Sequence, residues 1–167
     1  MIFVTVGTHE QPFNRLIKTI DLIKHKGIIK EDVFLQIGYS TYIPKYCEYK
    51  RFLSPSTISK LMDEASIIIT HGGPSSFVEA LQHNKMPIVV PRQKKFNEHV
   101  NDHQLFFCRE LHKRGFPIKV VEDEGSLYNI LGFNNTHLQN KFKSNNKTFN
   151  SDLESLVNEL FNKQKNY

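Results

Sequence analysis

The feature that most constrains the fold is an uninterrupted β-branched run, residues 67–70, which leads into a Gly-Gly-Pro turn at residues 72–74. Such runs are typical of strands that are buried on both faces of a parallel sheet. The residues after the turn predict a helix over 75–82 and a second apolar strand over 88–90. In this order of elements the turn lies at the carboxyl end of a strand, where open α/β sheets bind their ligands.

The glycine turn carries polar groups that suit a nucleotide. Gly72 and Gly73 lack Cβ, so the backbone can turn sharply and a ligand can approach closely. The helix start offers unpaired N–H groups and a partial positive charge to an anion, and Ser75 and Ser76 add hydroxyl donors. Glu79 lies one turn further on, where its carboxylate can accept hydrogen bonds from two adjacent hydroxyls such as those of a ribose. The alternative is an ordinary tight turn in which Ser75 only caps the helix.

Three other kinds of site fit these turns less well. No Gly-Lys-Ser/Thr follows the glycines, which excludes a P-loop. The Gly-x-Ser-x-Gly pattern is absent, so Ser75 and Ser76 are poor candidates for a hydrolase nucleophile. The turn at residues 7–10 reads Gly-Thr-His-Glu rather than Gly-x-Gly-x-x-Gly, which disfavours a nicotinamide-dependent dehydrogenase.

The rest of the chain continues the alternation of strands and helices. Further strands are predicted over 2–6, 33–37, 46–52 and 118–121, and further helices over 12–26, 54–65 and 97–114. This alternation predicts the fold class: α/β, a Rossmann-like parallel sheet with helices on both faces.

The chain of 167 residues is expected to form a single domain, with its Rossmann-like core in residues 1–125. Residues 134–150 are rich in Asn, Lys, Ser and Thr and predict a mobile connection. Residues 151–164 carry apolar side chains at helical spacing and predict a carboxyl-terminal amphipathic helix.

The composition bounds the environment and the partners of the protein. A net charge of +5, from 22 basic and 17 acidic residues, suits a phosphate-bearing ligand or an anionic membrane surface and disfavours nucleic acid. Cys47 and Cys108 do not form a CxxC pair, which fits a reducing cytosol without a structural disulfide. Neither a signal peptide nor a membrane span is predicted, so we expect a soluble cytoplasmic protein.

Two further polar segments are candidates for ligand contact. In the turn at residues 7–10, Thr8 can donate to a phosphate, and His9 or Glu10 can act as a base. The alternative is a turn with exposed polar residues.

The second segment, residues 97–104, reads NEHVNDHQ. His99 and His103 stand four positions apart, which would place two zinc ligands on one face of the predicted helix. Without a third ligand, a polar helix start that faces a sugar is the better interpretation. A basic cluster precedes this segment and consists of Arg92, Lys94 and Lys95. Its basic side chains suit a diphosphate or a membrane surface, and the alternative is a solvated loop.

Three segments together resemble a known family: the opening MIFVTVGTHEQPFNRLIK, the glycine turn with its helix, and NEHVNDHQ. The chain resembles the carboxyl-terminal, donor-binding half of family 28 glycosyltransferases with the GT-B fold, the MurG type. It is more closely similar to small soluble subunits of two-chain glycosyltransferases. One of these serves eukaryotic lipid-linked oligosaccharide synthesis, and others serve bacterial capsular and exopolysaccharide synthesis. The resemblance covers about residues 1–125.

The resemblance implies roles for the residues of the glycine turn and its helix. Glu79 would hold the ribose hydroxyls of UDP. Gly72, Gly73 and Ser76 would hold the diphosphate together with the helix start, and Thr8 would assist.

The resemblance also implies contacts outside the glycine turn. Phe52 would lie in the uracil-binding loop. His103 and Gln104 would contact the donor sugar, flanked by Asn101 and Asp102.

Two points qualify these roles. His71 stands where MurG-type enzymes often carry arginine, and it is a candidate for nucleotide binding. The family generally works without a metal in its active site, so no metal or other cofactor is expected.

The implied reaction is inverting transfer of a sugar from a UDP-sugar to a lipid-linked glycan, in polysaccharide biosynthesis, with Glu10 and His9 as candidates for the base. A GT-B enzyme needs two Rossmann halves and this chain supplies one. A membrane-anchored partner subunit would therefore bind the acceptor saccharide and recruit this chain to the inner face of the membrane.

The alternative is a non-catalytic subunit that binds a nucleotide sugar or stabilises its partner. The sequence leaves the sugar open between galactose, glucuronic acid, glucose and N-acetylglucosamine, and it leaves the linkage and the oligomeric state open as well.

Overall fold

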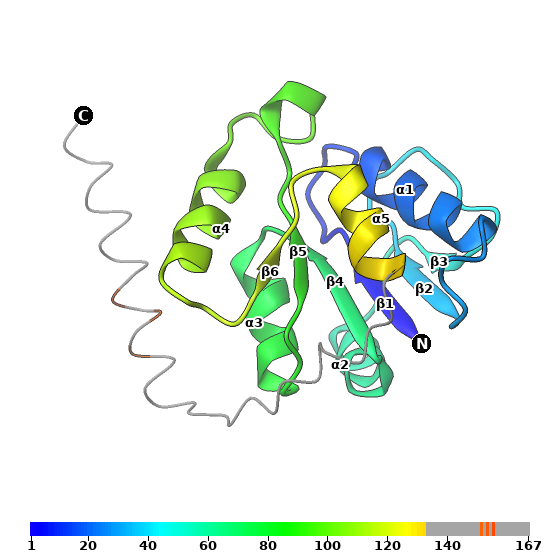
Figure 1. Cartoon of the computed structure of the whole chain (residues 1–167), viewed down its shortest axis with the longest axis horizontal. Coiled ribbons are helices and arrows are strands. Elements are labelled where there is room, and N and C mark those ends of the chain that lie inside the picture. The colour runs from blue at the N-terminus through cyan, green and yellow to red at the C-terminus, as the bar shows by residue number, and fades with distance from the viewer. Residues whose placement is uncertain (133–150, 152, 154, 156–167) are drawn as a thin grey trace.

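The computed structural model describes residues 1–132 and, beyond them, residues 151, 153 and 155. In this part of the chain six parallel strands form one sheet in the order β3-β2-β1-β4-β5-β6 (Figure 1). The strands are β1 (Ile2–Thr5), β2 (Val33–Gln36), β3 (Glu48–Lys50), β4 (Ile67–His71), β5 (Ile88–Val90) and β6 (Lys119–Val120). The four central strands are mostly buried, as their near-continuous apolar sequences require.

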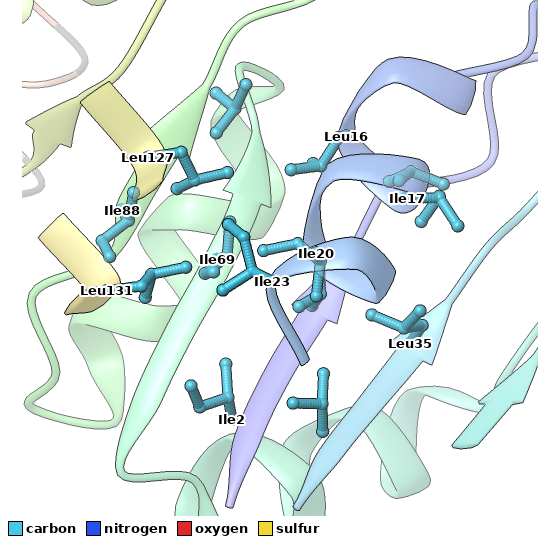
Figure 2. Packing of buried hydrophobic residues seen from close by; sticks show 14 of the residues in the cluster. Ile2, Leu16, Ile17, Ile20, Ile23, Leu35, Ile69, Ile88, Leu127 and Leu131 are labelled. Atoms are coloured by element: carbon cyan, nitrogen blue, oxygen red, sulfur yellow. The ribbon is translucent and has the colours of Figure 1, made fainter. Parts of the chain in front are cut away.

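Helices cover both faces of the sheet. They are α1 (Asn14–His25), α2 (Pro55–Glu64), α3 (Pro74–Gln82), α4 (His103–Lys113) and α5 (Glu124–Gly132), with a 3₁₀ turn, η1 (Lys94–Phe96), before α4. One apolar cluster joins the sheet to α1 and α5, which lie side by side over it (Figure 2). Two other clusters join the opposite face to α2 and to α3 and α4.

The alternation of side chains along β1 decides which layer each residue joins. Ile2 and Val4 belong to the cluster under α1, whereas Phe3 belongs to the cluster under α2. Because successive side chains of a strand point to opposite faces, a fully apolar strand can serve both layers at once.

The strand order contains a switch point between β1 and β4. From β1 the chain proceeds outward through β2 to β3, and it then returns to place β4 on the other side of β1. Two connections therefore leave the carboxyl ends of β1 and β4 in opposite directions, and ligands of open α/β sheets bind at this point. The two segments that follow these strand ends are residues 7–11 and residues 72–73.

The predicted fold class is confirmed, and all six predicted strands are present within a few residues of their expected bounds. The predicted helix over 97–114 is wrong at its start, because α4 begins only at His103. Helix α5 was not predicted. The predicted connection 134–150 and most of the predicted helix 151–164 lie outside the described residues. No helix in the described part of the chain is long and apolar enough to cross a membrane.

Candidate functional site

The His71 side chain joins the two turns at the switch point. It is 8% exposed, and its ring occupies the space where Gly7 and Gly73 would otherwise carry side chains. A Cβ on Gly7 would lie 2.5 Å from Cε1 of His71, and a Cβ on Gly73 would lie still closer to Nε2. Gly7 also has a φ of +70°, a backbone conformation that favours glycine. Both glycines are thus required by the packing of one buried imidazole.

Gly72 is restricted by helix α4 rather than by His71. A Cβ on Gly72 would lie 3.0 Å from Cβ of Gln104 and 3.1 Å from Sγ of Cys108. We expected the missing side chains of Gly72 and Gly73 to admit a ligand. The structure fills both spaces with protein, so the glycines bring β4, α3 and α4 together, and any ligand contact must come through their backbone groups.

Helix α3 begins directly after the two glycines. Gly73 is its N-cap residue and Pro74 is its first residue, so the helix starts one residue earlier than predicted, and Ser75 is not its cap. Pro74 has no N–H group, and the N–H of Ser76 donates to the carbonyl of Gly73 at 3.2 Å. An anion at this helix start is therefore attracted by the helix dipole, the N–H of Ser75 and the two serine hydroxyls. Ser75 is exposed and Ser76 partly exposed, and Glu79 remains partly exposed one turn further on. This helix start therefore offers donors for an anion and a carboxylate that solvent reaches.

The 7–11 turn meets the segment before α4 through a pair of histidines. The rings of His9 and His99 lie edge to face, with centroids 4.6 Å apart and an interplanar angle of 81°. The pKa of His9 is lowered by partial burial and then by the nearby positive charges of Arg92 and His99, against the opposing charge of Glu10. A lowered pKa keeps the imidazole uncharged at neutral pH, which is the state that a general base requires.

The segment 93–102 is an ordered loop in place of the predicted helix. Asn97 adopts a φ of +57° and ends η1. Oδ1 of Asn101 accepts the N–H of His103 at 3.1 Å, and Oδ1 of Asp102 accepts the N–H of Lys94 at 2.8 Å. These side-chain bonds to the backbone compete with helix formation and delay the start of α4.

The residues that the resemblance assigned to the donor sugar have divided roles. Oδ1 of Asp102 accepts a backbone N–H of its own loop, and Oδ1 of Asn101 accepts the N–H of His103 at the start of α4. Oε1 of Gln104 accepts the N–H of Arg92 at 3.2 Å, beside Gly72, and His103 is exposed at the first position of α4. Since His99 lies in the loop and His103 in the helix, the two do not share one helix face, and the basis for a zinc pair is wrong.

Phe52 lies at the other end of this edge of the sheet. Its ring packs edge to face on Tyr39, with centroids 5.1 Å apart, and the two side chains are 45% and 53% exposed. Phe52 follows β3, which is three strand spacings, or about 14 Å, from β4. The structure thus places Phe52 well apart from the glycine turn, on the same carboxyl edge.

Buried polar atoms without a hydrogen-bond partner gather near the switch point. In the described residues they are Oε1 of Gln11, Oγ1 of Thr70, Nδ1 of His71 and Nε of Arg92. All four residues belong to the carboxyl ends of β1, β4 and β5 or to the segments that follow them. Unpaired buried polar groups are costly, and native proteins retain them chiefly where a function or a bound group accounts for them.

The sequence reasoning missed two buried charged residues of this site. Arg92 was expected in an exposed basic cluster, but it is 1% exposed, whereas Lys94 and Lys95 are exposed as expected. Glu98 is 2% exposed, and its carboxylate binds Nε and Nη2 of Arg15 at 2.8 and 2.9 Å. Their only sequence signal is a Glu and an Arg close to an apolar strand, which is too common to identify buried charges.

Acidification is expected to destabilise the protein through His71. Burial, and then the charge of Arg92, lower the pKa of His71 from 6.5 to about 4. Between these two values the unfolded chain binds the proton more readily than the folded chain. The free energy of unfolding therefore falls as the pH falls from 6.5 toward 4. Between pH 7.5 and pH 5 the expected loss is about 2 kcal/mol, at about 1.4 kcal/mol per pKa unit.

Urea unfolding at pH 7.5, 6 and 5 measures this loss. A His71→Asn variant is the control and should show a clearly shallower dependence on pH. The comparison stays at pH 5 and above because Glu31 and Glu122, whose pKa values are lowered by hydrogen bonds from Ser66 and Arg109, lose their stabilising effect only at lower pH. Equal losses in both proteins would show that His71 does not carry the effect.

The sheet topology defines a Rossmann-like α/β domain of the kind found in GT-B glycosyltransferases. Residues 1–160 match the glycosyltransferase family 28 C-terminal domain, and the chain belongs to this family.

Two curated relatives and one solved structure are similar to this chain. The human UDP-N-acetylglucosamine transferase subunit ALG13 is 30% identical over 123 residues, and its mouse counterpart is 28% identical over 122 residues. Each match covers 68% of this chain but only 10% of the relative's length. The crystal structure of the glycotransferase of kitacinnamycin has a TM-score of 0.55 at 17% identity, and the match covers 75% of this chain and 32% of that chain. The last comparison supports the fold alone.

Proposed function

We propose that this chain binds a UDP-sugar at the switch point and is the donor-binding, catalytic subunit of a two-chain inverting glycosyltransferase. The observation that carries the proposal is the convergence of three polar segments, residues 7–11, the start of α3 and residues 99–104, in a member of family 28. The human relative's name, a UDP-N-acetylglucosamine transferase subunit, supports both the nucleotide sugar and the existence of a partner.

The nucleotide would lie along the carboxyl edge of the sheet. The first turn of α3, with the hydroxyls of Ser75 and Ser76, would bind the diphosphate, and Thr8 would add a donor from the opposite turn. Glu79 would accept hydrogen bonds from the ribose. Phe52, with Tyr39 behind it, would contact the uracil.

The donor sugar would lie between the 7–11 turn and the start of α4. His103 and Gln104 would contact it directly. Asn101 and Asp102 would act mainly by shaping the loop, because their side-chain oxygens bind backbone N–H groups. His71 would support both turns from beneath, because its ring is enclosed by the two glycines.

The acceptor side of the reaction would belong to another chain. A membrane-anchored subunit would hold a lipid-linked saccharide and recruit this protein from the cytoplasm to the inner face of the membrane, in bacterial capsular or exopolysaccharide synthesis.

No metal is assigned to the reaction, because the positive end of α3 would stabilise the leaving UDP. Separate titrations with UDP and with NAD, the ligand that a dehydrogenase of this fold would bind, test which nucleotide the chain binds. A donor screen with the co-expressed partner tests the sugar transfer.

The structure favours His9 over Glu10 as the base. His9 is partly buried against His99 with a lowered pKa, whereas Glu10 is exposed. We expect His9→Gln to lower kcat about 10²–10⁴-fold in the complex with the partner, while the Kd for UDP changes less than threefold. Glu10→Gln should have the smaller effect.

Steady-state kinetics of the complex and calorimetric titration of UDP measure the two quantities. His112→Gln, an exposed histidine in the last turn of α4, is the matched control and should leave both unchanged. Full turnover of both the His9 and the Glu10 variant would place the base on the partner and favour the non-catalytic alternative for this chain.

A further inference from the structure

Arg92 lies beneath the switch point with almost no contact to solvent. Its guanidinium donates to three backbone carbonyls: from Nη2 to Val6 at 3.0 Å, and from Nη1 to Gln11 at 2.7 Å and to Glu98 at 3.1 Å. The ring of Phe13 lies 4.8 Å from its Cζ. The positions of these carbonyls matter because Val6 immediately precedes the 7–11 turn, Gln11 ends it, and Glu98 belongs to the 93–102 loop.

The 93–102 loop is itself fixed from another direction. The Glu98 carboxylate binds the guanidinium of Arg15 on α1 and accepts the N–H of Gln93 at 3.0 Å. Nε2 of Gln93 in turn donates to the carbonyl of Glu122 at 2.8 Å, just beyond β6. Arg92 therefore connects the 7–11 turn to a loop that is already tied to α1 and β6.

The charge of Arg92 persists in this position. Burial lowers its pKa to about 10, so the group remains protonated at neutral pH. Its guanidinium donates to carbonyl oxygens, and the charge of Glu98 opposes the effect of burial on its pKa. Two imidazoles respond to the field of Arg92, because its charge lowers the pKa of both His9 and His71.

We propose that Arg92 is a positioning residue that clamps the 7–11 turn to the 93–102 loop and so holds His9 against His99. The proposal rests on the proposed function for its catalytic meaning, but the clamp is a property of the chain alone. Arg92 touches no substrate in this assignment and acts only through the two segments that it joins.

Three variants test the clamp. Arg92→Lys keeps the charge but cannot reach three carbonyls, since an ammonium lacks the planar fork of a guanidinium. Arg92→Met removes both charge and fork. Arg109→Met is the matched control, because Arg109 is an exposed arginine of α4 whose guanidinium pairs with the carboxylate of Glu122 and not with the 7–11 turn.

Amide hydrogen exchange of the isolated chain gives the first readout. Both Arg92 variants should raise exchange at residues 7–11 and 97–101 by at least tenfold, while the amides of β1 and β4 keep their protection. NMR titration of His9 gives the second readout. The titratable and charged groups that face His9 are Arg92, His99, Glu10 and His71. Arg92→Met should raise the pKa of His9, because the nearby positive charge is removed, and Arg92→Lys should raise it less.

Kinetics of the complex with the partner give the third readout. Both Arg92 variants should lower kcat at least tenfold with a smaller change in KM for the UDP-sugar. Exchange that rises equally across the whole sheet, unfolding of both variants, or an unchanged 7–11 turn would overturn the proposal. If the wild-type complex transfers no sugar, the proposed function fails, while the exchange and the His9 titration still decide whether Arg92 is a clamp.

Discussion

Replacing Gly7 by alanine is expected to destabilise the protein by about 2–5 kcal/mol and to lower its Tm by about 5–15 °C. The backbone strain of a non-glycine residue at a φ of +70° contributes about 1–2 kcal/mol. The overlap of the new Cβ with the His71 ring, at 2.5 Å, contributes about 1–3 kcal/mol. For a chain of this size each kcal/mol corresponds to about 2–4 °C. Thermal and urea unfolding measure the effect.

Two other glycines separate the causes of this loss. Gly115 has a φ of +76°, and no atom of the described residues lies within 4 Å of an added Cβ, so Gly115→Ala should show the strain alone. Gly73 has an ordinary φ of −76° but meets the His71 ring, so Gly73→Ala should show the overlap alone. In a His71→Ala background Gly73→Ala should cost less, because the overlapping ring is gone. A Gly7→Ala variant no less stable than Gly115→Ala would contradict the role of His71 as the spacer between the turns.

Replacing Glu79 by alanine is expected to weaken UDP binding about 10–100-fold. Hydrogen bonds to a charged group contribute about 1.5–3 kcal/mol, and about 1.4 kcal/mol corresponds to a factor of ten. Glu79 remains partly exposed on α3, one turn from the proposed diphosphate site, so its carboxylate is accessible to a ribose. Calorimetric titration with UDP measures the affinity.

The ribose contact can be isolated by changing the ligand as well as the protein. The wild-type chain should prefer UDP over its 2′-deoxy analogue, and the Glu79→Ala variant should lose that preference. Gln82→Ala, on the same helix but exposed near its end, is the control and should bind both ligands as the wild type does. If Glu79→Ala binds UDP with unchanged affinity, the assignment of the nucleotide to this edge of the sheet is wrong.

Much of the fold could be predicted because its signals are local. The β-branched run before the glycines forms β4, and the strand over 88–90 has the predicted bounds. Strands buried on both faces need continuous apolar sequence, so their positions can be read without knowing their partners. Helix α5 escaped prediction although its start carries helix signals: Asp123 accepts the N–H of Ser126, and Glu124 lies in the first turn. Its nine residues include Gly125 and Gly132, which weaken the helical pattern.

The candidate site was predictable only in part. The sequence indicated the segments around Gly7, Gly72 and Glu79, because polar turns after buried strands are expected at ligand sites. It gave the wrong reason for the glycines, since the atoms that exclude side chains there belong to His71, Gln104 and Cys108. Those contacts link elements that are distant in the sequence.

The amino-acid sequence by itself determined the strands, most of the helices and the edge of the sheet where polar groups collect, because hydrophobic periodicity and glycine turns act over a few residues. Only the tertiary structure decided that Arg92 and Glu98 are buried and that α4 starts at His103. The Arg15–Glu98 pair spans 83 positions, and a charge is stable inside a protein only when such distant partners surround it.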